Sequence, residues 1–249
     1  MNLLSVVAAR GGSTRVPGKN MRRVLGKPLM WYAMRNIASA GLLWRTIVVT
    51  DDDSIAKVAT NFGVEVCREP TVVHENSIRA IHRAWLYAVE HLRWKVDVIV
   101  STTTTSPCYS PLLIHRTAEA LTDQHDVVQT MVRSLPLGFL AHLQVDGTVE
   151  MVAPTGLSQD MPQIHAFSGC VAALWPRILQ QDFSDMAAFW AQLRIKGVVH
   201  NDPHLDIDEE GDLLWMELML KSGRYPHLYQ EASSRSPQPS RYPAGDLVM

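Results

Sequence analysis

Short apolar runs alternate with helical patterns up to residue 132, and this alternation constrains the fold more than any other feature of the chain. The apolar runs, at 3–7, 46–50, 64–67, 96–100 and 127–132, have the length of buried strands. Apolar residues at helical spacing lie between them, over 29–40, over 53–62, over 76–92 and over 110–121. Asp53 or Ser54 is the expected N-cap of the second of these helices, and Ser110, followed by Pro111, is the expected N-cap of the fourth. Strands that alternate with such helices form a parallel sheet covered on both faces. The predicted fold class is therefore α/β, with a doubly wound, mostly parallel sheet.

The alternation stops after residue 132, and 133–167 shows no helical period. Two short alternating runs, 139–145 and 148–152, are joined there by Asp146-Gly147, which is a hairpin signal. A flexible insertion is the alternative, but structureless loops of this length are uncommon inside compact domains. We therefore expect an extended β arm at 133–169, inserted into one domain that spans 1–224.

Strand and helix patterns resume after the arm. Residues 170–175 and 198–200 read as strands, 184–195 as a helix, and 209–221 as the last helix. From Tyr225 the composition shifts to Ser, Pro, Arg and Gln, which cannot bury a core. Residues 225–249 are therefore expected to form a disordered tail.

A loop rich in glycine and cations follows the first strand. Its sequence is Ala8-Ala9-Arg10-Gly11-Gly12-Ser13-Thr14-Arg15-Val16-Pro17-Gly18-Lys19-Asn20. Glycines let backbone N–H groups turn into a concavity that favours an anion, and the three cations add positive charge around it. The loop is neither a P-loop nor a dinucleotide-binding loop, since Asn20 follows Gly-Lys and Pro17 breaks the second pattern. A solvated basic turn is the alternative, but ligands of open α/β sheets bind where strands end, so we predict a phosphate-binding loop.

The composition is that of an ordinary globular protein, with 47% hydrophobic and 19% charged residues among 249. The formal net charge of -2, with no strongly basic half, argues against nucleic acid as a partner. No apolar run reaches the length of a membrane span and the N-terminus lacks a signal-peptide pattern, so we expect no membrane partner and a cytoplasmic location. The three cysteines are too scattered for a disulfide scaffold or a zinc site.

Two aspartates late in the chain form a candidate metal site. Asp206 and Asp208 are two residues apart, and in an extended segment such positions face the same side. Mg²⁺ suits them, because it binds one or two carboxylates and completes its shell with water and nucleotide phosphates. The alternative is a role at a helix N-terminus, which fits Glu209 and Glu210 better. We therefore expect Mg²⁺ at the two aspartates.

Four segments occur together in a distinctive order. They are 8–20 with Gly26-Lys27-Pro28-Leu29, then Thr50-Asp51, then Thr105-Ser106-Pro107, and finally Asp206-Ile207-Asp208 with Asp212-Leu213. From about Leu3 to about Leu220 the chain resembles the acylneuraminate cytidylyltransferases, the enzymes that make CMP-sialic acid and related CMP-sugars. The resemblance implies CTP as the nucleotide, with its base read by loop groups near Arg10 and Asn20. It also implies that the arm forms a homodimer and closes part of the partner's active site.

The cations and the aspartates divide the expected chemistry between them. The predicted catalytic residues are Arg10, Lys19, Asp206 and Asp208. Arg10, Lys19 and the loop amides would hold the triphosphate, and hydroxyls at the end of the central strand would donate to oxyanions without adding charge. The predicted nucleotide-binding residues are Ala8, Ala9, Arg10, Gly11, Gly12, Ser13, Arg15, Lys19, Asn20, Thr103, Thr105 and Ser106.

The acceptor side departs from the family pattern. Thr14 stands where the family usually has Lys, and the family's Gln-Pro-Thr-Ser-Pro-Leu-Arg is here 103–109, without its Gln and Arg. The family's Arg-Pro-Asn-Gly is here 166–169, without its Arg and Asn, which belong to the sugar-acid side of the pocket. Other groups must therefore hold the acceptor, or the acceptor is not an ordinary sialic acid. The candidate acceptor-binding residues are Arg79, His82, Tyr109, His165 and Ser168, each with an ordinary surface or core role as its alternative.

The sequence thus predicts an enzyme that transfers CMP from CTP to a small anionic acceptor and releases pyrophosphate. The expected acceptor is a sialic-type nonulosonic acid. The alternative is a small phosphonate such as phosphonoformate, which relatives of these enzymes activate in natural-product pathways. The absence of the family's Arg and Asn from 166–169 keeps this alternative open. A catalytically silent nucleotide-binding protein is the third hypothesis, which Thr14 favours and the two aspartates oppose.

Overall fold

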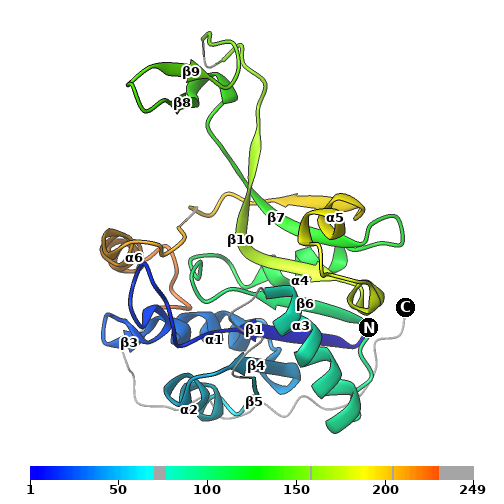
Figure 1. Cartoon of the computed structure of the whole chain (residues 1–249). Helices are drawn as coiled ribbons and strands as arrows, with labels where there is room; N and C mark the ends of the chain where they lie inside the picture. Colours follow the sequence, from blue (N-terminus) through cyan, green and yellow to red (C-terminus); the bar gives the residue numbers. More distant parts are fainter. Residues whose placement is uncertain (70–76, 158, 204, 230–249) are drawn as a thin grey trace, which may run out of the picture.

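The structure is a computed structural model that describes residues 1–69, 77–157, 159–203 and 205–229. Its centre is a seven-stranded sheet in the order β11-β7-β10-β6-β1-β4-β5 (Figure 1). β10 is antiparallel to β6 and β7, and the other neighbouring pairs are parallel. The strands are β1 (Leu3–Ala8), β4 (Thr46–Thr50), β5 (Glu65–Arg68), β6 (Val98–Thr102), β7 (Val127–Arg133), β10 (His165–Leu174) and β11 (Ile195–Val199). This arrangement confirms the predicted α/β class with a mostly parallel sheet.

Helices cover both faces of the sheet, because successive side chains of its inner strands point to opposite faces and both faces are apolar. On one face, α1 (Leu29–Ser39), α2 (Asp53–Asn61) and α4 (Leu112–Glu119) pack on residues such as Val7 and Val48. On the other, α3 (Ser77–Leu86), its π-helical continuation Tyr87–His91, and α5 (Met186–Ala191) pack on residues such as Val6 and Ile47. The alternation of Val6 with Val7 therefore separates two cores.

The direction of strand addition reverses at β1. β4 and β5 follow on one side of β1, and the chain then returns to place β6 on its other side. The loops that leave the carboxyl ends of β1 and β6 lie at this reversal, which is where open α/β sheets bind ligands. The strand order therefore brings loop 8–20 beside loop 103–106.

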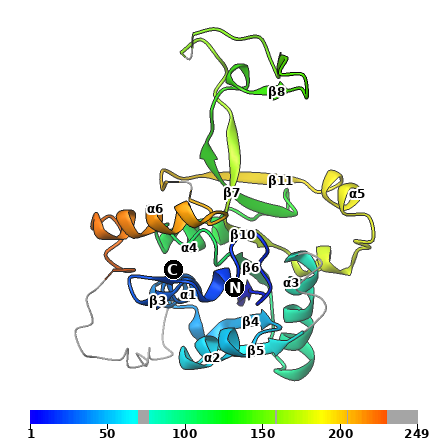
Figure 2. The same ribbon diagram turned by 60° about the vertical axis from the view of Figure 1, so that its left-hand side comes forward.

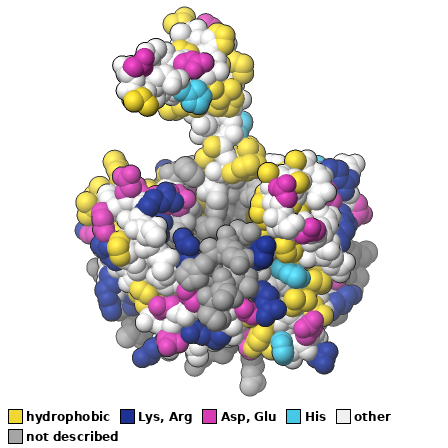
Figure 3. All heavy atoms as spheres, viewed as in Figure 1, with side chains coloured by type: hydrophobic (Ala, Val, Ile, Leu, Met, Phe, Trp, Pro, Cys, Tyr) yellow, Lys and Arg dark blue, Asp and Glu magenta, His cyan; other side chains and the backbone are white. Residues whose placement is uncertain are grey.

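An arm projects from the body of the molecule (Figures 1 and 2). β7 and β10 pair up to Arg133 and His165, and beyond them lie the 3-10 turn Leu137–Phe139 and a hairpin of β8 (Ala141–Leu143) and β9 (Val149–Met151). Gly147 has φ +85° in the hairpin turn, which explains the Asp-Gly signal, although both strands are shorter than expected. Hydrophobic side chains cover much of the arm in Figure 3; the exposed ones include Leu135, Phe139, Leu143, Val145, Val149 and Leu157.

A third apolar cluster joins the two ends of the domain. It combines Val24 of the short ribbon β2 (Arg23–Val24) and β3 (Lys27–Pro28) with Tyr32 of α1, and with Met216 and Leu220 of α6 (Glu210–Lys221). Leu205 and Ile207 belong to the same cluster. Packing of α6 on the ribbon therefore carries residues 206–208 to the loop that precedes the ribbon.

The structure corrects four local predictions. α5 ends at Ala191, and Ile195 begins β11 because Arg194 is fixed to the carboxylate of Asp126 by three hydrogen bonds. Asp52, and neither Asp53 nor Ser54, caps α2.

At α4 the Ser110 side chain makes no cap bond, and its N–H donates to Asp202 Oδ2. Residues 225–229, expected in the tail, pack instead, with Tyr225 and Leu228 only 2% exposed. The rest of the expected tail, 230–249, lies outside the described residues.

Candidate functional site

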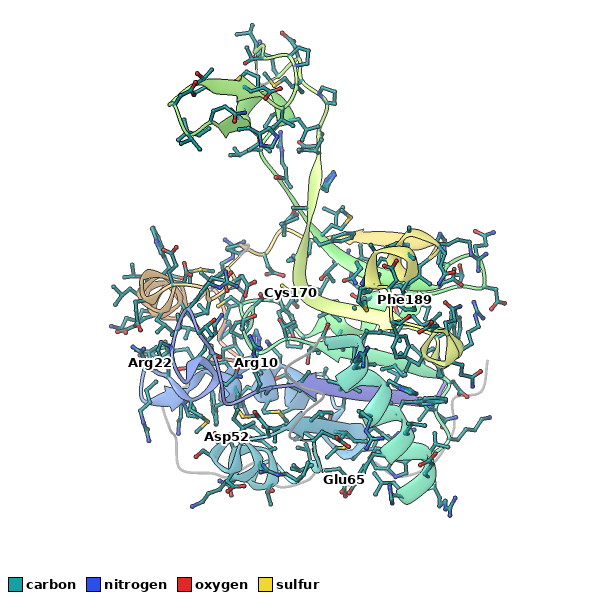
Figure 4. All side chains as sticks on the ribbon, in the orientation of Figure 1. Arg10, Arg22, Asp52, Glu65, Cys170 and Phe189 are labelled. Carbon is teal, nitrogen blue, oxygen red and sulfur yellow. The ribbon has the colours of Figure 1, made fainter. Side chains whose placement is uncertain are left out.

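A polar pocket of 180 Å³ lies where β1 and β6 end. Figure 4 labels Arg10 at this edge of the sheet, with Cys170 of β10 beyond it. The lining is cationic and rich in hydroxyls, with no carboxylate among its members, so it suits an anion. The lining residues are Ala8, Arg10, Ser13, Thr14, Arg15, Lys19, Asn20, Thr104 and Thr105.

Loop 8–20 leaves β1 in a defined path. Ala9 N–H donates to the carbonyl of Val49 at 3.0 Å, so Ala9 still follows the sheet and is buried. Gly18 has φ +62°, and this left-handed residue lets the chain turn into the short 3-10 helix Lys19–Met21. The turn directs Lys19 and Asn20 inward, where both are buried.

Asn20 fastens the loop to the end of β6. Its amide donates to the carbonyl of Arg10 at 2.8 Å, and its amide oxygen accepts a hydrogen bond from the hydroxyl of Thr104. Both donor and acceptor capacity of a buried amide are therefore used within the protein. In this structure Asn20 shapes the loop and also lines the pocket.

Two loop cations meet the second predicted aspartate. Arg15 Nη1 lies 2.7 Å from Asp208 Oδ2, and Lys19 Nζ lies 3.0 Å from Asp208 Oδ1. Lys19 also donates to the carbonyl of Ile207. Burial of Asp208 opposes its ionisation, but the hydrogen bonds and charges of Lys19 and Arg15 outweigh that effect and lower its pKa. Residues nearly 190 positions apart thus form one charged cluster.

The first aspartate is in a different environment. Asp206 Oδ1 is buried and has no hydrogen-bond partner among the described residues. A buried carboxylate oxygen without a partner is costly, and it is an observation that fits a cation ligand. Within the described ranges no three of the His, Cys, Asp and Glu side chains gather as a metal site. Asp206 and Asp208 are therefore the two residues here that could hold a divalent cation; Mg²⁺ generally binds one or two carboxylates together with nucleotide phosphates.

The N-terminus of α6 fixes the aspartate segment. Asp212 Oδ2 accepts from the N–H groups of Asp208 and Glu209, at 2.8 and 2.7 Å, and completes a capping box. Glu210 forms a paired contact with the guanidinium of Arg22, and Ile207 N–H donates to the carbonyl of Thr105 at 2.9 Å. The Asp212 contacts fix the backbone of the segment itself, and the contacts of Glu210 with Arg22 and of Ile207 with Thr105 hold it against the N-terminal part of the chain and the loop after β6. Glu209 and Asp212 cap the N-terminus of α6, which is the helix-terminal role considered above for the acidic residues of this segment. Asp206 and Asp208 lie upstream of the helix.

Some of the remaining predicted nucleotide-binding residues line the pocket, and others are exposed elsewhere or bonded within the protein. Ala8, Ser13 and Thr105 line the pocket beside the cations. Gly12 is exposed, while the Gly11 N–H is occupied by Asp51 Oδ1 at 2.8 Å. Thr103 Oγ1 donates to the carbonyl of Gly169, and Ser106 is buried, with a hydroxyl that lacks a partner in the described structure.

Most acceptor candidates do not reach the pocket. Tyr109 is fully buried, and Ser168 is 1% exposed with its hydroxyl donated to Thr130 Oγ1 at 2.7 Å. His82 stacks on Trp85 in an aromatic cluster on the face of the sheet that α3 and α5 cover, so its role is in packing. Arg79 lies on the same helix, α3, with a partly buried side chain, and His165 is exposed at the base of the arm. The prediction is wrong for Tyr109 and Ser168 because burial leaves them no surface.

Sequence reasoning named Asp51 and Asp212 only as motif positions, and it assigned no contact in the site to them or to Thr104. Thr104 lay inside a recognised run of hydroxyls, and Glu209-x-x-Asp212 is a readable capping-box signal. No local sequence pattern indicated the contact of Asp51 with Gly11, which lie 40 positions apart. In the part of the chain that the structure describes, no helix combines the length and apolar character needed to cross a bilayer.

Known proteins resemble this chain in sequence and in fold. A family model described as Cytidylyltransferase matches residues 4–152, which include the whole cation-rich loop. N-acylneuraminate cytidylyltransferase A of Danio rerio is 31% identical over 133 residues, covering 53% of this chain and 30% of that protein. The 3-deoxy-manno-octulosonate cytidylyltransferase of Geobacter metallireducens is 31% identical over 114 residues, covering 46% of this chain and 42% of that protein. The matches thus span less than half of either relative.

Solved structures share the fold over most of the chain. CMP:2-keto-3-deoxy-manno-octonic acid synthetase complexed with CTP aligns with a TM-score of 0.64 and 14% identity, covering 89% of this chain and 99% of that one. The 4-diphosphocytidyl-2C-methyl-D-erythritol synthase of Anaerococcus prevotii aligns with a TM-score of 0.60 and 13% identity, covering 88% and 98%. At this identity the likeness concerns the fold alone. Because the family model matches more than half of the residues, the chain belongs to the cytidylyltransferase family.

Proposed function

We propose that the protein is a CTP-dependent nucleotidyltransferase that moves CMP from CTP to a small anionic acceptor and releases pyrophosphate. The observation that carries the proposal is the meeting of Arg15 and Lys19 with Asp208 at the edge of a cationic pocket. Positive groups that face phosphates, next to carboxylates that face a divalent cation, are what nucleotidyl transfer requires. Family membership supports cytidine as the base.

The reaction is an in-line displacement at the α-phosphorus. An acceptor oxygen forms a bond to that phosphorus while the bond to the oxygen bridging the β-phosphate breaks. The bonding electron pair leaves with pyrophosphate, and the acceptor proton passes to solvent. Little covalent chemistry falls to the protein, so positioning and charge stabilisation carry the rate.

Arg15 and Lys19 differ in how far their side chains are exposed, and therefore in how freely they can move. The Arg15 side chain is 68% exposed, so it can exchange the Asp208 carboxylate for a phosphate of the bound nucleotide. The Lys19 side chain is only 10% exposed and stays between the loop and the aspartate segment. We assign Arg15 and Arg10 to the outer part of the triphosphate and Lys19 to the α-phosphate side. Asp206 and Asp208 would hold Mg²⁺, which supplies Lewis-acid polarisation of the phosphate when bound.

We assign a sialic-type nonulosonic acid as the preferred acceptor. The named relatives act on acylneuraminate, on 3-deoxy-manno-octulosonate and, in Campylobacter jejuni, on pseudaminic acid, all of which are acidic sugars. The phosphonate alternative is favoured by one local observation. Ser168, at the position of a lost polar ligand, is buried and donates its hydroxyl to Thr130, so this position supplies no group to a sugar carboxylate.

We also propose that the protein acts as a homodimer through its arm. An arm with this much exposed apolar surface needs a cover, and a second copy supplies the same surface in return. β10, which carries one side of the arm, pairs with β6, and Thr104 and Thr105 just after β6 line the pocket; closure of the pocket by a partner's arm is part of this proposal.

Pyrophosphate release tests the activity. The purified chain would be incubated with CTP and Mg²⁺ and with one of three acceptors: N-acetylneuraminate, 3-deoxy-manno-octulosonate or phosphonoformate. Release with a sugar acid supports the assignment, and release with phosphonoformate alone moves it to the phosphonate class. No release with any acceptor, from protein that still binds CTP, would support a silent nucleotide-binding protein.

A further inference from the structure

A glycine amide of the cation-rich loop is held by an aspartate from the neighbouring strand. Gly11 N–H donates to Asp51 Oδ1 at 2.8 Å, although 40 positions separate the two. Asp51 directly follows β4, which pairs in parallel with β1, so both groups lie at the carboxyl edge of the sheet. An amide expected to face a phosphate therefore faces a carboxylate.

The loop also approaches the turn after β4 too closely for a side chain. A Cβ at Gly11 would lie 2.7 Å from Asp52 Oδ2 and 2.9 Å from Asp52 Cβ, well inside contact distance. Asp52 cannot easily retreat, because its Oδ1 accepts from the N–H groups of Ser54 and Ile55 as the N-cap of α2. Figure 4 labels Asp52 on the same side of the sheet as Arg10. The turn is thus a fixed surface against which the loop rests.

Arg68, the last residue of β5, stabilises that surface. Its guanidinium donates to the carbonyls of Asp52 and Asp51, at 2.7 and 3.1 Å, and to Asp53 Oδ1 at 2.8 Å. Three bonds from one planar group fix the direction of the backbone at 51–53. The ends of three adjacent strands, β5, β4 and β1, are therefore connected in sequence to the start of the cationic loop.

We propose that Asp51 is a positioning residue for nucleotide binding. By holding the Gly11 amide, it sets the path of the loop so that Arg10, Arg15 and Lys19 converge on one triphosphate; this role rests on the proposed function. The contact with Gly11 needs an acceptor oxygen at position 51, and the side-chain amide of asparagine also supplies one. Asp51→Asn therefore keeps this hydrogen bond, and Asp51→Ala removes it.

The test compares Asp51→Asn, Asp51→Ala and the matched control Asp53→Ala, which removes only the exposed carboxylate partner of Arg68. We expect Asp51→Ala to raise the KM for CTP about tenfold, on the order of one hydrogen bond, with kcat changed by less than about twofold. Asp51→Asn and Asp53→Ala should stay close to the wild type. Equal losses in Asp51→Asn and Asp51→Ala, or a wild-type KM in Asp51→Ala, would overturn the proposal.

Amide hydrogen exchange gives a readout that does not depend on turnover. The Gly11 amide should be protected in the wild type and in Asp51→Asn, and should exchange freely in Asp51→Ala. If the wild type releases no pyrophosphate, the proposed function fails while this measurement still decides the role of Asp51. If Asp51→Ala does not fold, Asp51→Asn carries the test: a raised KM for CTP or a freely exchanging Gly11 amide in that variant would refute the proposal.

Discussion

Asp208 is the residue on which both ends of the chain converge. It neutralises Lys19, whose ammonium is otherwise bonded only to a backbone carbonyl among the contacts described. Asp208→Asn should therefore lower the free energy of unfolding by about 2 kcal/mol, the usual scale for hydrogen bonds to charged groups. Urea denaturation measures the loss.

The control for Asp208 is a neighbouring carboxylate. Glu210 pairs with Arg22 at the surface, with side chains 60% and 40% exposed, and such exposed pairs contribute little. Glu210→Gln should cost less than about 1 kcal/mol. A loss in Asp208→Asn no larger than in Glu210→Gln would mean that the buried ammonium does not depend on its partner.

His227 gives the molecule a pH dependence that can be assigned to one residue. Burial lowers the pKa of His227, and its ring Nε2 lies 2.8 Å from Asn36 Oδ1. The unfolded chain, with an ordinary pKa of about 6.5, takes up the proton first as the pH falls. The stabilisation is thus complete above that value and is lost as the pH falls through the lower folded pKa.

Thermal unfolding at about pH 7.5 and about pH 5.5 measures this effect. The Tm of the wild type should fall more over this interval than that of His227→Gln, which keeps an amide donor but does not titrate. Parallel falls in the two proteins would assign the pH dependence to other groups.

Among the elements, the bulge in β10 shapes the base of the arm. Its register with β7 shifts between Phe167 and Ala172, and Thr130 satisfies the irregular backbone: its hydroxyl accepts from Ser168 Oγ and Val171 N–H and donates to the Val171 carbonyl. Thr130 is fully buried, so the isosteric Thr130→Val should lower the free energy of unfolding by about 2 kcal/mol through unsatisfied polar groups.

Thr148→Val is the control, because Thr148 lies exposed in the hairpin turn of the arm. Chemical denaturation should show almost no change for this variant. If Thr130→Val were as stable as Thr148→Val, the bulge would not depend on the threonine hydroxyl.

Elements with a strong local pattern were predictable from sequence. The β-branched run of β4 and the helical spacing of α1 before Gly41 fell where the structure has them. The prediction of a helix over 184–195 was wrong because Ile195 pairs with β7, a tertiary contact with no local sign. Tyr225 and Leu228 were assigned to a tail for the same reason, since their burial depends on α6 and α1.

The charged residues of the site were predictable from sequence, but the contacts that support them were not. The cations of the loop and the pair Asp206 and Asp208 stood out by composition and spacing, and the structure brings Lys19 to Asp208. The supporting contacts, such as Asn20 with Thr104, depend on which strand ends are neighbours. Strand order is set by the whole fold, so these partners could not be read from a local pattern.

At the scale of the whole molecule, the arm carries many exposed apolar side chains that nothing in the described structure covers. Leu143 and Val149, which are 76% and 58% exposed, face each other across the hairpin. The pair Leu143→Glu and Val149→Glu should convert the proposed dimer to a monomer, because charges in an apolar interface are costly to desolvate. Mass photometry or sedimentation measures the change, with Gln144→Glu as the control. A wild type that is already monomeric would contradict the dimer.

The central claim is that the cationic loop and the late aspartates act on one nucleotide. The most direct measurement is CTP-dependent pyrophosphate release with an acidic sugar acceptor, in the wild type, in Asp206→Asn and in Glu210→Gln. We predict release by the wild type and by Glu210→Gln, and a loss of at least about a hundredfold in Asp206→Asn with an unchanged Tm. Wild-type rates in Asp206→Asn would contradict the account.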